Sequence, residues 1–450
     1  LISVVLQRPP GGRKVLQDRK DMPGKKNNKK VAVGYDLGKS YAQISFCYLE
    51  ETEPETVSAV TGTEQYNIPT VLCKRKGVGQ WYYGKEAIKF AREEEGILVE
   101  DLSALAERGE DVLVEGEAFD PAALLTLFVK RSLSLLNMRV SLNQIEAFMF
   151  TMEELTPRMV DVLGKVAAGL NLKAKHICFQ NHMESFYAYT LHQNKELWKN
   201  DVVIFEYDTV LKSLWFKCNA RTTPQVVMIE QQEYPQMQRR VWKEEEEKKT
   251  RQMEELDQLF LSIAERALQG EIVSTVFLLG DGFKEEWAKE SLKFLCRNRR
   301  AFKGNNLYSK GACYSMMERL NAGRLWKEYV YLGEDKLKSN IGMRALRRGE
   351  DSYYAILDAG TNWYEISSDF DIILESGNTV EFVITPMTGG KVENRTITLE
   401  GLPQRPRATT RLNVHIEMTA VSQATVTIED MGFGELFSSS GKAWTQTIMV

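Results

Sequence analysis

The pattern of apolar and polar residues along the chain changes near residue 328. Before that point, short apolar runs alternate with stretches in which apolar residues recur every three or four positions, the spacing of amphipathic helices. Beyond it, short alternating runs follow one another between turns such as 375–378 and 389–390, which is typical of an all-β module. We therefore predict an α/β body followed by a β-sandwich domain over residues 329–450.

The body divides into two successive halves of similar texture. Its expected strands cover 31–49 (two strands), 68–73, 145–150, 176–179, 201–206, 214–218, 226–229 and 274–279. One expected helix starts at 87, and the others cover 120–136, 156–170, 183–191, 236–268 and 287–294. The β domain is expected to contain strands at 353–357, 379–384, 395–399, 411–416 and 424–428.

The first two strands enclose the most informative turn of the chain, Asp36-Leu-Gly38-Lys39-Ser40. A turn of this composition places backbone N–H groups and a carboxylate at one edge of a sheet. Such N–H groups can hold a phosphate, and the carboxylate can hold a hydrated Mg²⁺. Many hairpins carry Asp-x-Gly for turn geometry alone, so this signal needs support from elsewhere in the chain.

Composition narrows the class of protein and its surroundings. Hydrophobic residues make up 43% of the 450 residues and the net charge is -4, so a nucleic-acid partner is not expected. No apolar run approaches the roughly 20 residues of a membrane-spanning helix, and we expect no membrane association. The scattered cysteines resemble small buried hydrophobes and predict a reducing, cytoplasmic location; they are Cys47, Cys73, Cys178, Cys218, Cys296 and Cys313.

Residues 1–30 differ from the rest of the chain. They carry nine Lys or Arg against two Asp, and they contain Pro9-Pro10-Gly11-Gly12. Such a segment buries too little apolar surface to order itself, so we predict a disordered basic leader. Because the chain opens on Leu1, Met22 is a candidate start, and whether residues 1–21 belong to the native protein is left open.

The order of the short motifs resembles the DnaK-type 70-kDa heat-shock chaperones of the actin-like ATPase superfamily. The resemblance covers nearly everything from Val31 onward. The motifs are Gly34–Ser40, Ile68–Val71 with Tyr83–Ala87, Ala168–Leu172 with Ala188-Tyr189, Leu279–Gly282, Lys310–Cys313, Leu402–Pro406 and Val414–Met418. Each motif is weak alone, and the ordered set is fairly specific.

The resemblance implies a two-lobed actin-like ATPase fold with ribonuclease H-like lobes at 31–195 and 196–328, followed by a peptide-binding type of β domain. It implies a cleft for ATP or ADP with Mg²⁺, in which Asp36 holds the metal through water. The implied nucleotide-binding residues are Asp36, Gly38, Lys39, Ser40, Asp208, Thr209, Gly280, Asp281 and Gly282, and the weak catalytic candidates are Asp36 and Asp208.

Departures from the family pattern point to a degenerate site. The second phosphate loop falls at 206–212, where no glycine is present, so this loop should have another shape. The family's catalytic lysine is missing, because no Lys lies between Lys89 and Lys130. Asn181-His182 replaces the family's Glu-Pro. Since phosphoryl transfer depends on positioning and charge around Mg²⁺ and the phosphates, we predict weak or absent ATP hydrolysis.

Three functions stay open on the sequence alone. The first is a chaperone-like scaffold, either nucleotide-responsive or purely structural, that binds a protein or peptide partner through the β domain. The second is a slow ATPase chaperone whose site is rebuilt on Lys39 or Lys212. The third is a sugar or acetate kinase, against which the β domain argues. A β domain ending at Val450 without a helical lid is expected to bind peptides weakly or to dock a fixed partner.

Two further candidates have simple structural explanations. A pairing of His182 with Glu184 would imitate an acid–base pair, but one helical turn without a third partner is usually chance. Asp281, between two glycines, is also explained as a residue that holds its turn.

Overall fold

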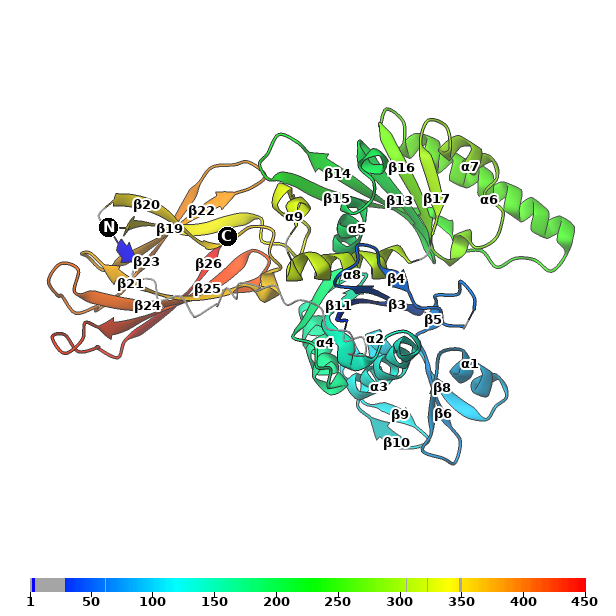
Figure 1. Ribbon diagram of the computed structural model, residues 1–450, viewed down its shortest axis with the longest axis horizontal. Coiled ribbons are helices and arrows are strands. Elements are labelled where there is room, and N and C mark those ends of the chain that lie inside the picture. Colours follow the sequence, from blue (N-terminus) through cyan, green and yellow to red (C-terminus); the bar gives the residue numbers. More distant parts are fainter. Residues whose placement is uncertain (1, 5–28, 61, 305, 322, 348–349) are drawn as a thin grey trace, which may run out of the picture. The chain divides into compact units, whose positions relative to one another are not determined.

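A computed structural model describes residues 2–4, 29–60, 62–304, 306–321, 323–347 and 350–450. The chain divides into two compact units. The first comprises 1–24 together with 331–450, and the second comprises 25–330. The second unit is a mixed α/β body and the first is built of β-strands (Figure 1). The units therefore meet in sequence at residues 330 and 331, close to the change in pattern at 328.

Sheet I lies in the amino-terminal half of the α/β body. Its strand order is β12-β11-β2-β3-β4, with β5 also paired to β3. Strand β2 is antiparallel to β3 and parallel to β11, which is parallel to β12. The strands are β2 (Val31–Leu37), β3 (Tyr41–Tyr48), β4 (Glu55–Thr56), β5 (Ile68–Pro69), β11 (Ile145–Met152) and β12 (His176–Asn181). Every residue of β2 is buried, as expected for the central strand of a covered sheet.

Sheet II repeats this arrangement in the second half of the body. Its order is β17-β16-β13-β14-β15-β18, with β13 antiparallel to β14 and parallel to β16. The strands are β13 (Asp201–Tyr207), β14 (Val210–Asn219), β15 (Gln225–Gln238), β16 (Val273–Leu279), β17 (Arg300–Lys303) and β18 (Tyr329–Tyr331). Numbered in chain order, the main strands of both sheets read 3-2-1-4-5.

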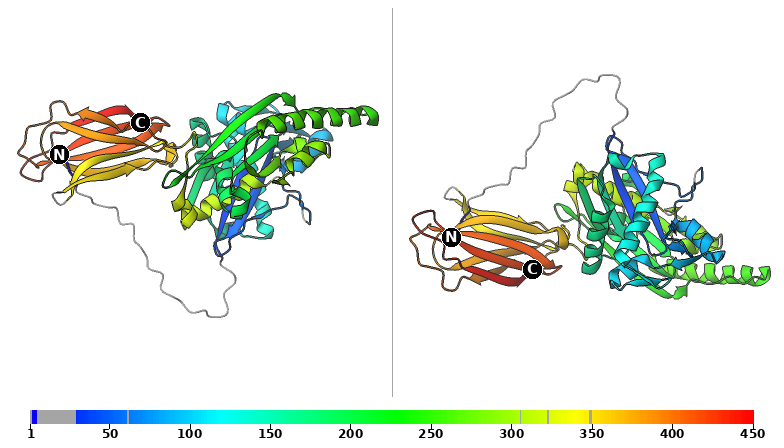
Figure 2. Two further views of the ribbon diagram at one scale, coloured as in Figure 1. Left: turned by 90° about the horizontal axis from the view of Figure 1, so that it is seen from above. Right: turned by 90° about the horizontal axis from the view of Figure 1, so that it is seen from below.

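Helices cover the two sheets, and a small insertion follows β5 (Figures 1 and 2). The insertion holds the sheet β7-β6-β8 and the hairpin β9–β10. Its elements are β6 (Leu72–Arg75), β7 (Trp81–Tyr83), α1 (Gly84–Arg92), β8 (Gly96–Val99), α2 (Leu102–Arg108), β9 (Val112–Val114) and β10 (Glu117–Phe119). The other helices are α3 (Pro121–Leu133), α4 (Pro157–Leu170), α5 (His182–Leu191), α6 (Glu246–Ala267), α7 (Glu290–Leu295), α8 (Leu307–Leu320) and α9 (Arg324–Glu328).

Helix α8 lies against both β2 and α5, although it is far from them in sequence. Two glycines permit this approach. A Cβ atom on Gly34 of β2 would lie 2.2 Å from the backbone oxygen of Ser309, and one on Gly311 would lie 1.9 Å from that of Ser185. Any larger residue at either position would push the helix away. The Gly311 motif is therefore explained by packing between α5 and α8.

The β domain is one nine-stranded sheet with a single core. Its order is β23-β22-β19-β1-β21-β24-β25-β26, with β20 also paired to β19. Residues from β19 and β22 share the core with residues from β21, β24 and β25, so the two halves of the sheet face each other. The strands are β1 (Ile2–Val4), β19 (Ser339–Arg347), β20 (Glu350–Leu357), β21 (Ser367–Leu374), β22 (Thr379–Pro386), β23 (Glu393–Thr398), β24 (Thr410–Ala420), β25 (Gln423–Gly432) and β26 (Ala443–Met449).

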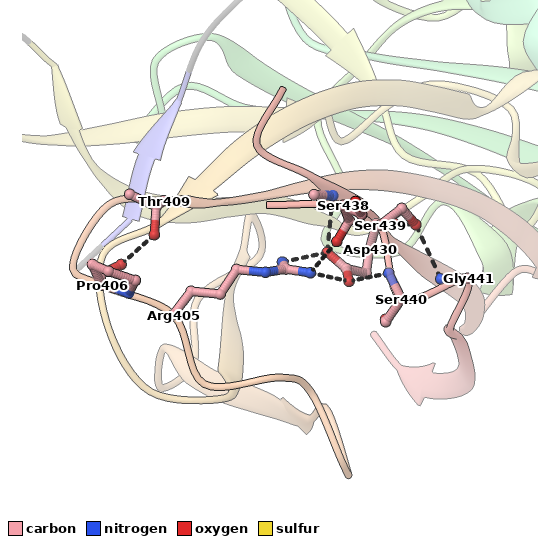
Figure 3. A network of polar contacts seen from close by, with 9 residues as sticks. Arg405, Pro406, Thr409, Asp430, Ser438, Ser439, Ser440 and Gly441 are labelled. Atoms are coloured by element: carbon pink, nitrogen blue, oxygen red, sulfur yellow. Dashed lines mark hydrogen bonds and ion pairs between the residues drawn. The ribbon is translucent and has the colours of Figure 1, made fainter. Parts of the chain in front are cut away.

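A buried ion pair fastens the loops at one end of the β domain (Figure 3). Both terminal nitrogens of Arg405 donate to the carboxylate of Asp430 at 2.7 Å, and both side chains are almost completely inaccessible to solvent. The backbone N–H groups of Gly432 and Ser440 donate to the same carboxylate. Its pKa is held well below the usual range, first by Arg405 and then by the bonds from Ser440 and Gly432.

Some expectations for the fold are wrong in detail. The helix expected over 236–268 begins only at Glu246, because β15 extends to Gln238 on a polar sequence that pairs along the full length of β14. Ile2–Val4 form a strand, so the disordered leader does not hold for these three residues, and 5–28 lie outside the described residues. All six cysteines are free; Cys47, Cys73 and Cys313 are buried, but Cys218 and Cys296 are exposed.

Candidate functional site

The expected nucleotide residues lie at the ends of corresponding strands in the two sheets. Asp36 belongs to the carboxyl-terminal part of β2, and Asp208 follows β13, the equivalent central strand of sheet II. Asp281 lies two residues beyond the end of β16, after Gly280. Side chains at the carboxyl ends of such strands are commonly brought to one edge of a sheet, where ligands bind. These residues therefore lie at comparable positions in the two sheets, and their role in binding a nucleotide stays a prediction.

His182 is bonded to the first of these carboxylates. Its Nε2 lies 2.8 Å from Oδ1 of Asp36, and both side chains are nearly buried. The imidazole ring stacks on the Tyr308 ring with 3.9 Å between centroids and 6° between planes. The Asn181 side chain accepts a hydrogen bond from the Glu184 N–H and caps α5, which fixes His182 at the first position of the helix. Strand β2 and helices α5 and α8 thus converge here.

The electrostatics of this group favour a proton on the imidazole. Burial alone lowers the pKa of His182, but the negative charge and hydrogen bond of Asp36, followed by the charges of Glu206 and Glu153, outweigh it and raise the pKa. Burial raises the pKa of Glu206 to about 7, because the nearby cation of His182 compensates it only in part. The cluster therefore contains a carboxyl group, Glu206, whose pKa is raised to about 7, beside an imidazole whose pKa is also raised.

An ion pair joins the two sheets beside this cluster. Nζ of Lys212, in β14, lies 2.5 Å from Oε1 of Glu153, which follows β11. Nζ of Lys212 also lies 3.4 Å from a carboxylate oxygen of Glu233. Lys39, on the first turn, is exposed and contributes to lowering the pKa of Glu153. Lys212 is thus already engaged by two carboxylates, whereas Lys39 makes no ion pair with any residue in the described part of the chain.

The turn at 280–282 packs tightly on the end of β13. Gly280 has φ +93°, and a Cβ there would lie 2.6 Å from the backbone oxygen of Tyr207. A Cβ on Gly282 would lie 2.3 Å from the Tyr207 ring. The Asp281 N–H donates to Oδ1 of Asp208 at 2.8 Å, and its carboxylate lies 2.7 Å from Nζ of Lys284. The simple explanation of Asp281, as a residue that holds its turn, is therefore consistent with the geometry.

The remaining predicted residues have backbone roles. A Cβ on Gly38 would lie 2.4 Å from the Tyr41 carbonyl oxygen, so the turn requires glycine at this position. The carbonyl of Gly38 accepts from the Thr70 hydroxyl, and that of Ser40 accepts from the Thr70 N–H. The carbonyl of Thr209 accepts from Arg239. The loop that follows β13 is built without a left-handed residue, in agreement with its lack of glycine.

These residues do not fit Mg²⁺ in the manner that the resemblance implies. One oxygen of Asp36 is bonded to an imidazole that tends to carry the positive charge itself. Asp208 is bonded to the Asp281 backbone. Within the described residues, no three His, Cys, Asp or Glu side chains gather closely enough to hold a metal ion. No catalytic step through Mg²⁺ or ATP follows from this geometry.

Two known protein families together match most of the chain. The family described as family of unknown function (DUF5716) C-terminal matches residues 53–334. The chain belongs to this family. Residues 336–450, which form nearly all of the β domain, match a second description, domain of unknown function DUF8552. No curated protein matches the chain. Among the described residues of this DUF5716 protein, no helix has the length and apolar character needed to cross a membrane.

His182 bonds to Asp36, a contact that its sequence neighbours do not indicate. Glu184, the partner suggested by the sequence, lies 3.7 Å from a guanidinium nitrogen of Arg319. The position of His182 in the chain could have indicated this contact. His182 directly follows β12, and in sheet I only β11 separates β12 from β2, the strand that contains Asp36. Tyr308 and Glu153 carried no motif, because their roles depend on contacts between segments far apart in sequence.

Proposed function

We propose that this DUF5716 protein is an actin-like, two-lobed scaffold with a degenerate ATP cleft. Its two lobes correspond to sheets I and II with their helices. The shared strand order 3-2-1-4-5, and the position of α8 between β2 and α5, support this proposal. Duplicated lobes of this kind permit hinge closure around a cleft. Free cysteines are consistent with the cytoplasmic location that we propose.

The observation that carries the proposal is the contact between His182 and Asp36. A carboxylate that holds hydrated Mg²⁺ needs its negative charge directed at the metal. Here a nearly buried imidazole occupies one carboxylate oxygen, and its raised pKa favours the charged form. A protonated His182 would repel a divalent cation and leave little net charge to attract one. We infer that ATP turnover is weak or absent.

The alternative of a slow ATPase has less support. It needs Lys39 or Lys212 to reach the terminal phosphate. Lys212 is held by Glu153 and Glu233, so it would have to abandon both carboxylates. Lys39 remains available on the exposed turn, and it is the residue on which this alternative rests.

We further propose that the β domain binds an extended peptide or a protein partner. Strand β21 pairs with β24 along one side, and on its other side Ile372, Ile373 and Leu374 pair with the three residues of β1. Because β1 also pairs with β19, it fills a slot between two strands, and a slot that accepts one short extended segment through backbone bonds is suited to accept another. The segment Ile2–Val4 would then act as an internal occupant of the partner's site.

Calorimetric titration of ATP and ADP, with and without Mg²⁺, tests the nucleotide part of this proposal. Binding that does not require Mg²⁺ and that survives Asp36→Ala agrees with a degenerate cleft, as does absence of binding at millimolar nucleotide. Asp161→Ala, which removes an exposed carboxylate on α4, is the matched control. Mg²⁺-dependent binding that is lost in Asp36→Ala and kept in Asp161→Ala would contradict the proposal.

A further inference from the structure

A pocket is lined by residues close in sequence to the two turns, but the turns themselves do not line it. Its volume is about 730 Å³, which lies within the range of pockets for small ligands. The turn residues Asp36–Ser40 and Gly280–Gly282 are absent from its lining. Two residues just beyond the turns do line the pocket: Tyr41, which follows Ser40, and Lys284, which lies two residues after Gly282. The pocket is therefore a separate candidate site.

Helix α1 supplies one face of this pocket with positive charge. Lys85, Lys89 and Arg92 are spaced four and three residues apart, so they lie along the same side of the helix. With Lys284 they give four cations in the lining, against the two carboxylates of Glu64 and Glu93. The pocket thus carries a surplus of two positive charges in a protein whose net charge is -4.

The cations of this pocket are only partly neutralised. Lys89 lies 4.0 Å from Glu93, the limit of an ion pair, and Lys85 donates to the side-chain oxygen of Gln65. Lys284 is paired with Asp281. Arg92 makes no ion pair with a residue in the described ranges. An arginine in this situation offers several N–H donors in a planar fork that matches phosphate oxygens.

Two tyrosines complete the chemical character of the pocket. Tyr41 is half-buried and lies under the Lys284 ammonium, which is 5.2 Å from the ring centroid. Tyr66 lines the pocket from the loop that precedes β5. Aromatic rings next to cations provide a flat apolar surface close to an anion-binding one.

We propose that this pocket binds a small organic phosphate that carries a flat ring. Its phosphate groups would lie against Arg92, Lys89 and Lys284, and its ring would lie against the tyrosines. Glu64 and Glu93 would accept hydrogen bonds from ring or sugar donors. This proposal does not rest on Mg²⁺ or on Asp36. It also differs from the proposed function because α1 and Lys284, rather than the two turns, hold the ligand.

Titration of pyrophosphate and of ADP in the presence of a metal chelator tests this proposal on the intact chain. We expect both to bind, and ADP more tightly because of its ring. Arg92→Ala and Lys284→Ala should each weaken binding about tenfold or more, the usual effect of losing a charge-assisted hydrogen bond. Lys165→Ala, an exposed lysine on α4, is the matched control and should leave binding unchanged.

The outcomes separate this pocket from the cleft. ADP binding that falls in Arg92→Ala and persists in Asp36→Ala supports the pocket whatever the fate of the proposed cleft. Binding of pyrophosphate alone, with no gain from the ring of ADP, overturns the flat-ring part of the proposal. No binding of either probe at millimolar concentration, or binding that is equal in Arg92→Ala and Lys165→Ala, overturns the site.

Discussion

His182 Nε2 lies 2.8 Å from Asp36 Oδ1, and this contact joins helix α5 to the central strand of sheet I. A second histidine, His192, makes a similar arrangement at the carboxyl-terminal cap of α5. His192 Nε2 lies 3.1 Å from Oε1 of Glu318, and its ring stacks on Tyr314 as the ring of His182 stacks on Tyr308. Each histidine thus connects one end of α5 to a carboxylate and to an aromatic ring of α8. The carboxylate is that of Asp36 in β2 for His182 and that of Glu318 in α8 for His192.

The two histidines provide a matched pair of variants. His182→Ala and His192→Ala should each lower the free energy of unfolding by about 1–3 kcal/mol, because each removes the imidazole that is bonded to a nearly buried carboxylate. Urea unfolding measures this loss. Only His182→Ala should gain stabilisation by Mg²⁺, since it frees the Asp36 carboxylate. Equal responses of the two variants to Mg²⁺ would show that His182 does not control the carboxylate.

The free energy of unfolding should decrease as the pH rises from about 5 to 8. The pKa of Glu206 is raised by folding to about 7, so the unfolded chain releases this proton at lower pH than the folded chain does. The raised pKa of His182 acts in the same direction, because its stabilising proton is lost as the pH passes the folded value. Denaturation at a series of pH values measures the slope.

Glu206→Gln should flatten this dependence, since it removes the carboxyl group that binds a proton in the folded state. With the neutral amide, the free energy of unfolding should depend less steeply on pH between 5 and 7, and the unfolding transition should stay cooperative. Glu230→Gln, in strand β15 of the same sheet and outside the cluster, is the control and should retain the original slope. A flat profile in the unmodified protein would contradict the account of Glu206.

Arg405→Ala should destabilise the β domain far more than Arg407→Ala. Arg405 is buried with Asp430, and removal of one partner from a buried pair costs about 3–5 kcal/mol. Arg407 is exposed and its pair with Glu375 should contribute about 0–1 kcal/mol. The two sites lie two residues apart, which makes the comparison direct. Thermal unfolding followed by β-sheet circular dichroism measures both, and similar losses would contradict the structural role of the pair.

Deletion of residues 1–6 should expose one edge of β21. The backbone groups of Ile372–Leu374 that face β1 would lose their partners, and their amide hydrogens should exchange faster with solvent. A synthetic peptide with the sequence of residues 1–6 should restore protection, while a peptide of the same composition and scrambled order should restore less. Unchanged exchange after the deletion would argue against β21 as an acceptor edge.

The sequence predicted the elements of sheets I and II better than their contacts. Buried runs such as 145–150 and 201–206 were readily identified, because a strand covered on both faces consists largely of apolar residues. Strand β15 was cut short at its polar end, where pairing with β14 rather than side-chain pattern decides the structure. In the β domain, β21 was missed because its exposed positions include Asp369.

The candidate site was only partly predictable for a related reason. Asp36 and the Gly280–Gly282 turn carry local signals of turn geometry, whereas Asp208 was named only through the resemblance to the chaperone family. The partners that determine their chemistry come from other segments: His182 from the start of α5 and Tyr308 from α8. No local pattern reveals a contact between residues separated by more than a hundred positions, so the engagement of Asp36 required the structure.

The most direct test of the central claim is a single-turnover measurement with ATP. Purified protein in excess over ATP and Mg²⁺ is followed for phosphate release, with Asp36→Ala and Asp161→Ala in parallel. The account predicts that all three proteins release phosphate no faster than buffer alone, because His182 engages the carboxylate that would direct Mg²⁺. Release that is clearly faster in the unmodified protein and in Asp161→Ala, and lost in Asp36→Ala, would contradict it.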